Sequence, residues 1–141
     1  MLFGLSVPSL LLVAIAVAAF WIYLPFLVVA YARVQIGYNQ ETMAAPRAAF
    51  DKLPDYGKRA TWAHQNALEA FPIFAAAALI AYVTHQTSAL AGWAAIAWMI
   101  ARFFSPVFYI LNVPILRSLM FAIGSICSFT LIGLSLISTL K

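Results

Sequence analysis

The feature that most constrains this chain is the run from Met1 to Ala32, which contains no charged side chain. About 20 apolar residues in a helix cross the hydrocarbon core of a bilayer, so this run is long enough for one span. Of the 141 residues, 65% are hydrophobic and 9% are charged, whereas a soluble domain is nearer half apolar and a quarter charged. The stretch lacks the positive n-region of a signal peptide and continues past Phe20, so we expect a retained first span. The sequence therefore predicts an integral membrane protein.

Three further apolar segments predict an all-α membrane domain that covers residues 1–141. The expected spans are about 5–32, 60–83, 89–111 and 115–140, and the one long connection is a polar loop over 33–58. The other two connections are short, which favours an up-down-up-down bundle of four transmembrane helices.

The basic residues predict the orientation in the membrane. The first loop together with Arg59 contains five Lys or Arg, and the second connection contains none. Basic loops remain on the cytoplasmic side, so the first and third loops are expected there and both termini on the opposite side. We expect a bacterial inner membrane or its equivalent. The basic residues are too few, and too little interleaved with aromatic residues, to indicate a nucleic-acid partner.

Two polar stripes interrupt the apolar spans. At 3.6 residues per turn, the second span carries one stripe and the third span another. The stripe residues are Arg59, Trp62, Asn66 and Glu69 on the second span, and Arg102, Ser105, Tyr109 and Asn112 on the third. An unpaired charge in mid-bilayer costs about 2.5 kcal/mol or more, so we predict an ion pair between Glu69 and Arg102. This pair either sets the helix register or belongs to a binding site.

A polar pocket near the cytoplasmic end is predicted from Asn66, Tyr109 and Arg117, which the ion pair leaves unexplained. Arg117 follows a proline at the start of the fourth span. There it either faces the pocket or reaches a lipid headgroup. Ser125 and Ser128 lie on a face of small residues and indicate close helix packing. No spacing of Cys, His or carboxylate residues indicates a metal site.

The segment AHQNALEAFP (63–72) resembles the A-H-x-N-x-x-E-x-x-P signature of the second helix in the MAPEG family, the membrane-associated proteins in eicosanoid and glutathione metabolism. The segments ARFFSPVFY and ILRS resemble its third helix and the start of its fourth. The resemblance covers the four-span layout and its long first loop. It implies a homotrimer of four-helix protomers that holds glutathione in a cytoplasm-facing cleft between protomers.

The resemblance also implies roles for individual residues. Arg117 matches the arginine beside the glutathione sulfur and Ser118 the serine that follows it, so these two are the expected catalytic residues. Arg102 matches the partner of the family's glutamate, and Arg33 looks like a basic residue that reaches from the neighbouring protomer. The expected glutathione-binding residues are Arg33, His64, Asn66, Glu69, Arg102 and Tyr109.

Two functions follow from the resemblance. The first is a glutathione-dependent transferase or peroxidase that acts on lipophilic electrophiles or hydroperoxides, with an arginine that stabilises the thiolate. The second is a non-catalytic trimer that binds membrane lipid or presents a lipophilic small molecule to a partner. Trp62 and Phe121 favour the second, because glutathione-using members commonly have arginine, and several have tyrosine, at these positions. A small transporter is disfavoured because the chain has no inverted repeat or broken helix pair.

Overall fold

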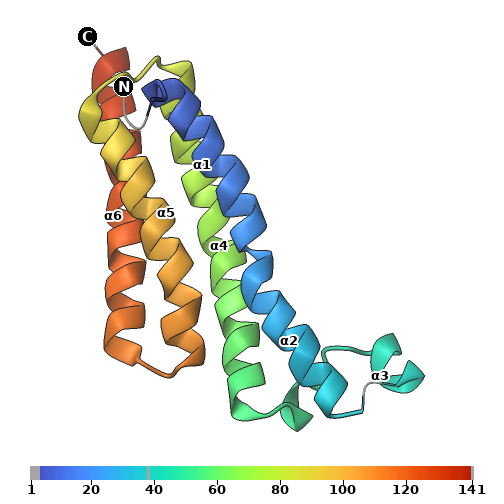
Figure 1. Ribbon diagram of the computed structural model, residues 1–141. Coiled ribbons are helices and arrows are strands. Elements are labelled where there is room, and N and C mark those ends of the chain that lie inside the picture. Colours follow the sequence, from blue (N-terminus) through green and yellow to red (C-terminus); the bar gives the residue numbers. More distant parts are fainter. Residues whose placement is uncertain (1–3, 38, 141) are drawn as a thin grey trace.

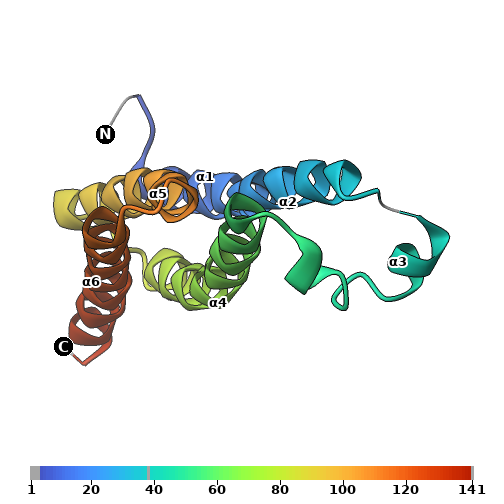
Figure 2. The ribbon, with the colours of Figure 1, turned by 90° about the horizontal axis from the view of Figure 1, so that it is seen from below.

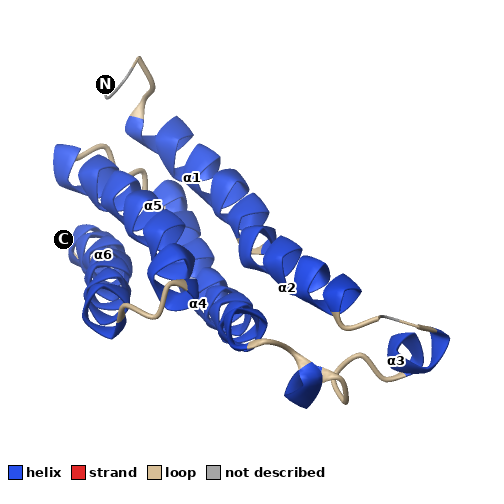
Figure 3. Cartoon of the chain, turned by 60° about the horizontal axis from the view of Figure 1, so that its bottom comes forward, coloured by secondary structure: helices blue, strands red, loops and turns tan. Residues whose placement is uncertain are grey.

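The computed structural model describes residues 4–37 and 39–140, in which every regular element is a helix (Figure 3). Four helical stretches are long and apolar enough to cross a membrane. The first consists of α1 (Val7–Trp21) and α2 (Tyr23–Gln35), and the others are α4 (Asp55–Val83), α5 (Ala89–Ile110) and α6 (Pro114–Thr139). Two short elements, α3 (Gln40–Ala44) and the 3-10 helix η1 (Phe50–Lys52), lie in the long connection. The predicted all-α architecture with four candidate spans is confirmed.

The four long stretches run alternately up and down, so that the start of α1 and the end of α6 lie at the same end of the bundle (Figure 1). α4 is central and packs against α1, α2, α5 and α6, while α5 and α6 pack most extensively against each other. Seen from below, the long connection with α3 extends beyond α2, away from α5 and α6 (Figure 2). The turn between α5 and α6 lies at the same end as this connection (Figure 1).

The first membrane stretch is interrupted at Ile22, between α1 and α2. Pro25 has no backbone N–H, so the carbonyl four residues before it loses its helical partner. α2 then continues to Gln35, and α4 already begins at Asp55, so the connection is shorter than the 33–58 loop expected. Both extensions suit the helix dipole, because Arg33 lies in the last turn of α2 and Asp55 in the first turn of α4.

Small side chains let α4 approach its neighbours closely along its length. Six buried alanines of α4 face its neighbours: Ala60, Ala63, Ala70, Ala77, Ala78 and Ala81. Phe74 stacks on Trp98 of α5, with ring centroids 3.7 Å apart and 11° between the ring planes. Leu11 of α1 and Leu131 of α6 belong to the same core. Close packing of small residues is the usual way in which membrane helices associate.

Each short turn ends its helix with a residue in the left-handed conformation. His85 after α4 has a φ of 54°, and Asn112 after α5 has a φ of 58°. After α5, the N–H of Asn112 bonds to the Tyr109 carbonyl and that of Val113 to the Phe108 carbonyl, which is a Schellman motif. This motif turns the chain sharply into α6 and brings the end of α5 next to the start of α6.

Candidate functional site

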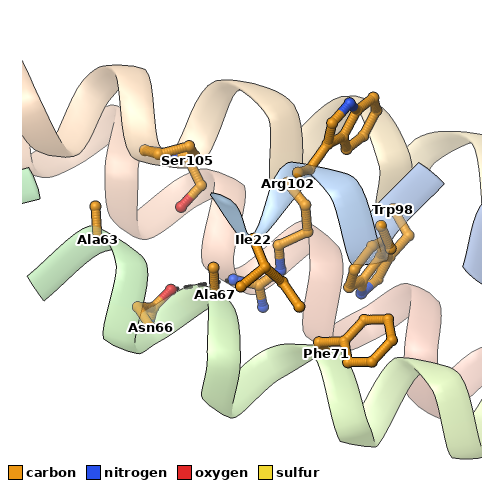
Figure 4. Close-up of a pocket in the computed structure, with 11 residues that line it drawn as sticks. Ile22, Ala63, Asn66, Ala67, Phe71, Trp98, Arg102 and Ser105 are labelled. Carbon is orange, nitrogen blue, oxygen red and sulfur yellow. Dashed lines mark hydrogen bonds between the residues drawn. The ribbon is translucent and has the colours of Figure 1, made fainter. Parts of the chain in front are cut away.

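Arg102 of α5 is buried where α4, α5 and α6 meet, with 9% of its surface exposed. Its Nη1 donates a hydrogen bond of 3.2 Å to Oδ1 of Asn66 (Figure 4). Its Cζ lies 5.2 Å from the ring centroid of Phe121 and 5.8 Å from that of Trp98, within cation–π range. Gly124 leaves room for the guanidinium, since a Cβ there would lie 2.9 Å from Arg102 Nε. Three helices therefore hold this side chain in place.

The predicted ion pair between Glu69 and Arg102 is wrong for this chain, because Asn66 occupies the place expected for the carboxylate. Glu69 is exposed, and its Oε1 accepts a hydrogen bond of 3.3 Å from Nε2 of Gln65 on the same helix. Asn66 and Glu69 are three residues apart, which separates their directions by about 60° around the helix axis. That rotation turns the amide toward α5 and leaves the carboxylate on the outer surface of α4.

A small cavity adjoins the bond between Asn66 and Arg102, between α1, α4 and α5 (Figure 4). Its volume is about 20 Å³, which is the space that one water molecule requires. Ser105 contributes a hydroxyl to its wall, and the other lining side chains are largely apolar. Trp98 Nε1 and Arg102 Nε are buried without a hydrogen-bond partner in the described part of the chain. Polar groups thus come together within the apolar length of the bundle.

A larger pocket of about 210 Å³, here called the Arg117 pocket, lies beside the α5–α6 turn. Arg117 stacks on Tyr109, with its Cζ 4.4 Å from the ring centroid. The lining residues are Asn66, Ser105, Tyr109, Arg117, Ser118 and Phe121. The three residues from which the sequence predicted a polar pocket, Asn66, Tyr109 and Arg117, therefore do line one pocket. Arg117 is the charged group among these six, so the electrostatic field in the pocket favours an anion.

An apolar groove of about 470 Å³ lies next to the Arg117 pocket, between α4 and α6. Phe121 lines both spaces, and Arg102 lies at the inner wall of the groove. The remaining lining residues are Glu69, Ala70, Ile73, Ser125, Ser128 and Phe129. Ser128 Oγ bonds to the carbonyl of Gly124 within α6, so this serine adds little polarity to the groove. A polar pocket and an apolar groove are thus adjacent on one side of the protein.

Arg59 connects α4 by a hydrogen bond to the end of α5, next to the turn beside the Arg117 pocket. Its Nε donates a hydrogen bond of 2.9 Å to the carbonyl oxygen of Ile110, at the end of α5. In a continuing helix that carbonyl would accept from the residue four positions on, which is Pro114 and has no N–H. Arg59 supplies the missing donor and places its positive charge at the negative end of α5.

His64 lies away from the Arg117 pocket. Its Nδ1 is 2.8 Å from the carbonyl oxygen of Ile22, so Nδ1 carries the proton in this bond. The imidazole packs against α2, with its ring centroid 5.2 Å from that of Phe26. This direction is nearly opposite to that of the polar stripe on the same helix.

Arg33 also lies away from the Arg117 pocket within this chain. It lines a second pocket of about 330 Å³, between α2, the long connection and α4. Trp62 lines the same second pocket and packs against Phe50, with ring centroids 5.8 Å apart. Trp62, where the family resemblance leads one to expect arginine in a glutathione-using member, therefore faces the second pocket in this chain.

The sequence alone assigns no role to three residues at the candidate site: Arg59, Ser105 and Gly124. Arg59 and Ser105 belong to the polar stripes, and the proline four residues after Ile110 signals a carbonyl that needs a donor. Gly124 gives no such local signal, because its role depends on the depth to which Arg102 reaches from another helix. In residues 4–37 and 39–140, no three His, Cys, Asp or Glu side chains are grouped so as to hold a metal ion.

Comparison with known protein families identifies the family of this chain. The model of the MAPEG family matches residues 10–137, from α1 into α6, and includes every residue of the Arg117 pocket. Comparison with curated proteins and with solved structures gives no match. Because the family model covers nearly the whole chain, this membrane protein belongs to the MAPEG family, of the kind that functions in eicosanoid and glutathione metabolism.

Proposed function

We propose that this protein is a glutathione-dependent transferase or peroxidase that acts on lipophilic electrophiles or hydroperoxides within the membrane. The observation that carries the proposal is the Arg117 pocket, in which a guanidinium stacks on Tyr109 beside an apolar groove. The pocket suits a thiolate, and the groove suits an apolar second substrate. Membership in the family supports glutathione as the thiol.

In this proposal, Arg117 stabilises the anionic form of the thiol. A thiol with a pKa of about 8.5 is only a few per cent thiolate at pH 7, and a nearby cation increases that fraction. The Ser118 hydroxyl is a hydrogen-bond donor for the same sulfur. Glutathione supplies the nucleophile, whose sulfur bonds to the electrophilic centre while the leaving group departs with the bonding electrons. Tyr109 holds the guanidinium in place through the ring contact.

Arg102 serves in this proposal as a positioning residue. It is buried, and it holds Asn66 at the wall of the Arg117 pocket through the bond to Oδ1. That bond leaves the amide NH₂ of Asn66 as a donor toward a ligand. Glu69 is exposed beside the groove and suits the ammonium group of glutathione.

A homotrimer is part of the proposal. Glutathione has two carboxylates besides its thiol, and Arg117 is the one cation among the described residues that line the pocket. A second protomer would supply further cations, which supports the arrangement between protomers that the family resemblance implies. We also propose that the end with the long connection faces the cytoplasm, because the basic residues are concentrated there.

Glutathione binding by the purified full-length protein tests the proposal. Calorimetry should show saturable binding at millimolar glutathione, and an electrophilic aryl halide should be conjugated in the same preparation. Arg117→Ala should raise the apparent pKa of the bound thiol, measured by thiolate absorbance. Lys52→Ala, which removes an exposed cation of the long connection outside the pocket, is the matched control and should leave that pKa unchanged. Absence of saturable binding would refute the proposal.

A non-catalytic lipid-binding trimer is the second candidate function. The size and apolar lining of the groove support it, together with Trp62 in place of a family arginine. This candidate predicts saturable binding of a lipophilic probe that Phe129→Ala weakens, with no conjugation of the aryl halide.

A further inference from the structure

The second pocket lies at the loop end of the bundle and is separate from the Arg117 pocket. Its volume of about 330 Å³ falls in the range of small-molecule sites. Among the described residues, none lines both pockets. The residues that line the second pocket are Arg33, Pro46, Arg47, Phe50, Leu53, Thr61, Trp62 and Gln65. Of these residues, Arg33 has an expected role toward glutathione, in the cleft with a neighbouring protomer, and the proposed reaction uses none of the other seven.

Close packing of α2, α4 and the connection forms this pocket. A Cβ at Gly57 would lie 2.8 Å from Cβ of Ala32, so glycine lets the two helices meet at their ends. Leu53 is 4% exposed and anchors the connection, and Phe50 packs against Trp62. The walls are therefore held by apolar contacts from three segments, so the pocket is formed before a ligand binds.

Among the described residues that line the pocket, the two charged groups are both cations. Arg33 lies half-buried in the last turn of α2, and Arg47 is exposed on the connection. No carboxylate is among the described lining residues, and Asp51 and Asp55 are exposed elsewhere on the same segment. Guanidinium groups bind phosphate oxygens with two parallel N–H donors. The pocket therefore suits a phosphate-like anion.

The position of the pocket along the bundle indicates where that anion comes from. From the pocket toward mid-bilayer, the outer surfaces of α2 and α4 carry exposed apolar side chains, including Phe26 and Leu68. Trp62 is 45% exposed at the boundary, where tryptophan is enriched in membrane proteins. A phospholipid has the same order of groups, with its phosphate next to the start of its acyl chains.

We propose that the second pocket binds the phosphodiester headgroup of an anionic phospholipid. Arg33 and Arg47 contact the phosphate, Trp62 lies at the level of the glycerol, and the acyl chains follow the surface near Phe26 and Leu68. The proposal goes beyond the glutathione function and does not rest on it. It also accounts for Trp62, whose amphipathic ring suits a headgroup boundary better than a site for glutathione carboxylates.

The test measures lipid retained by the purified full-length protein, by native mass spectrometry after exchange into detergent with added phosphatidylglycerol or phosphatidylcholine. We expect phosphatidylglycerol to be retained in preference. Arg47→Gln should lower its occupancy about fivefold, the contribution of one basic residue at an anionic surface. Lys52→Gln, which removes an exposed cation of the same connection outside the pocket, is the matched control.

Glutathione separates the two sources of an anionic group. We expect 10-fold excess glutathione over lipid to leave phosphatidylglycerol bound, and Arg117→Gln to leave it bound as well. Displacement by glutathione would assign the pocket to glutathione carboxylates and overturn the proposal. Equal losses from Arg47→Gln and Lys52→Gln, or equal retention of the two lipids, would also overturn it. The glutathione competition uses the unaltered protein, so its result tests the proposal even if a variant folds poorly.

Discussion

The half of the bundle near the termini and the half near the long connection are held together in different ways. Near the termini, aromatic and aliphatic side chains fill the space, as in the stack of Phe74 on Trp98. Near the connection, single polar contacts join the helices, as in the bonds from Arg102 to Asn66 and from Arg59 to the carbonyl of Ile110. The Arg117 pocket and the second pocket both lie in this polar half.

The difference shows how stability and binding are divided in a small membrane protein. Lipid gives no hydrophobic drive for helix association, so close packing and a few hydrogen bonds must hold the bundle. Dense packing leaves no space for a ligand. Near the connection, polar side chains lie between α4, α5 and α6, and they supply the groups that a ligand needs.

Removal of the aromatic stack should have the largest effect. Phe74 is fully buried, and Phe74→Ala should lower the free energy of unfolding by about 3–5 kcal/mol, because it deletes a large core side chain. Phe20→Ala is the matched control, since Phe20 is 77% exposed. Both are measured by unfolding in detergent. Equal losses from the two variants would show that the stack is not the stable centre of this half.

Removal of the bond between Asn66 and Arg102 should have the next largest effect on the free energy of unfolding. Asn66→Leu keeps the approximate shape but leaves a buried guanidinium N–H without its acceptor, which should cost about 1–3 kcal/mol. Glu69→Gln should change the free energy of unfolding by less than about 0.5 kcal/mol, because the carboxylate is exposed. The reverse order, with Glu69→Gln the more harmful, would restore the ion pair that the sequence predicted.

Crowding of Arg102 should lower the free energy of unfolding by less than loss of its bond to Asn66 does. Gly124→Ala would place a Cβ 2.9 Å from Arg102 Nε and should cost about 1–2 kcal/mol as the guanidinium shifts. Gly133→Ala on the same helix is the control, because no atom of the described residues lies within 4 Å of a Cβ there. The control should be neutral or stabilising by up to about 1 kcal/mol, from helix propensity. Similar effects of the two substitutions would contradict the packing of Arg102 against α6.

Removal of the bond from Arg59 to the end of α5 should have the smallest effect on the free energy of unfolding. Arg59→Gln should cost about 1 kcal/mol, since one hydrogen bond is lost and the freed carbonyl lies near the bundle end. The change in the α5–α6 turn should be clearer than the change in the free energy of unfolding. We expect faster hydrogen exchange at the amides of Asn112 and Val113. Unchanged exchange in that turn would show that Arg59 does not hold it.

Much of this fold and part of its candidate site could be predicted because both depend on periodicity. Apolar length predicted the four spans, and the period of 3.6 residues per turn predicted that Asn66 lies on a polar face. The pairing of Arg102 could not be predicted in the same way. Asn66 and Glu69 lie on one stripe, and the choice between them depends on how α4 is rotated against α5.

The sequence by itself determined a four-span helical membrane protein, because a bilayer requires long apolar helices and allows polar groups only on inward stripes. Local signals also determined where α5 ends, since Asn112 takes the left-handed conformation and Pro114 cannot donate. The tertiary structure alone decided that Asn66 binds Arg102, that Gly124 makes room for it, and that Trp62 opens to a second pocket. These features depend on helix rotation and depth of packing between residues far apart in the chain, and neither quantity is contained in the periodicity of a single helix.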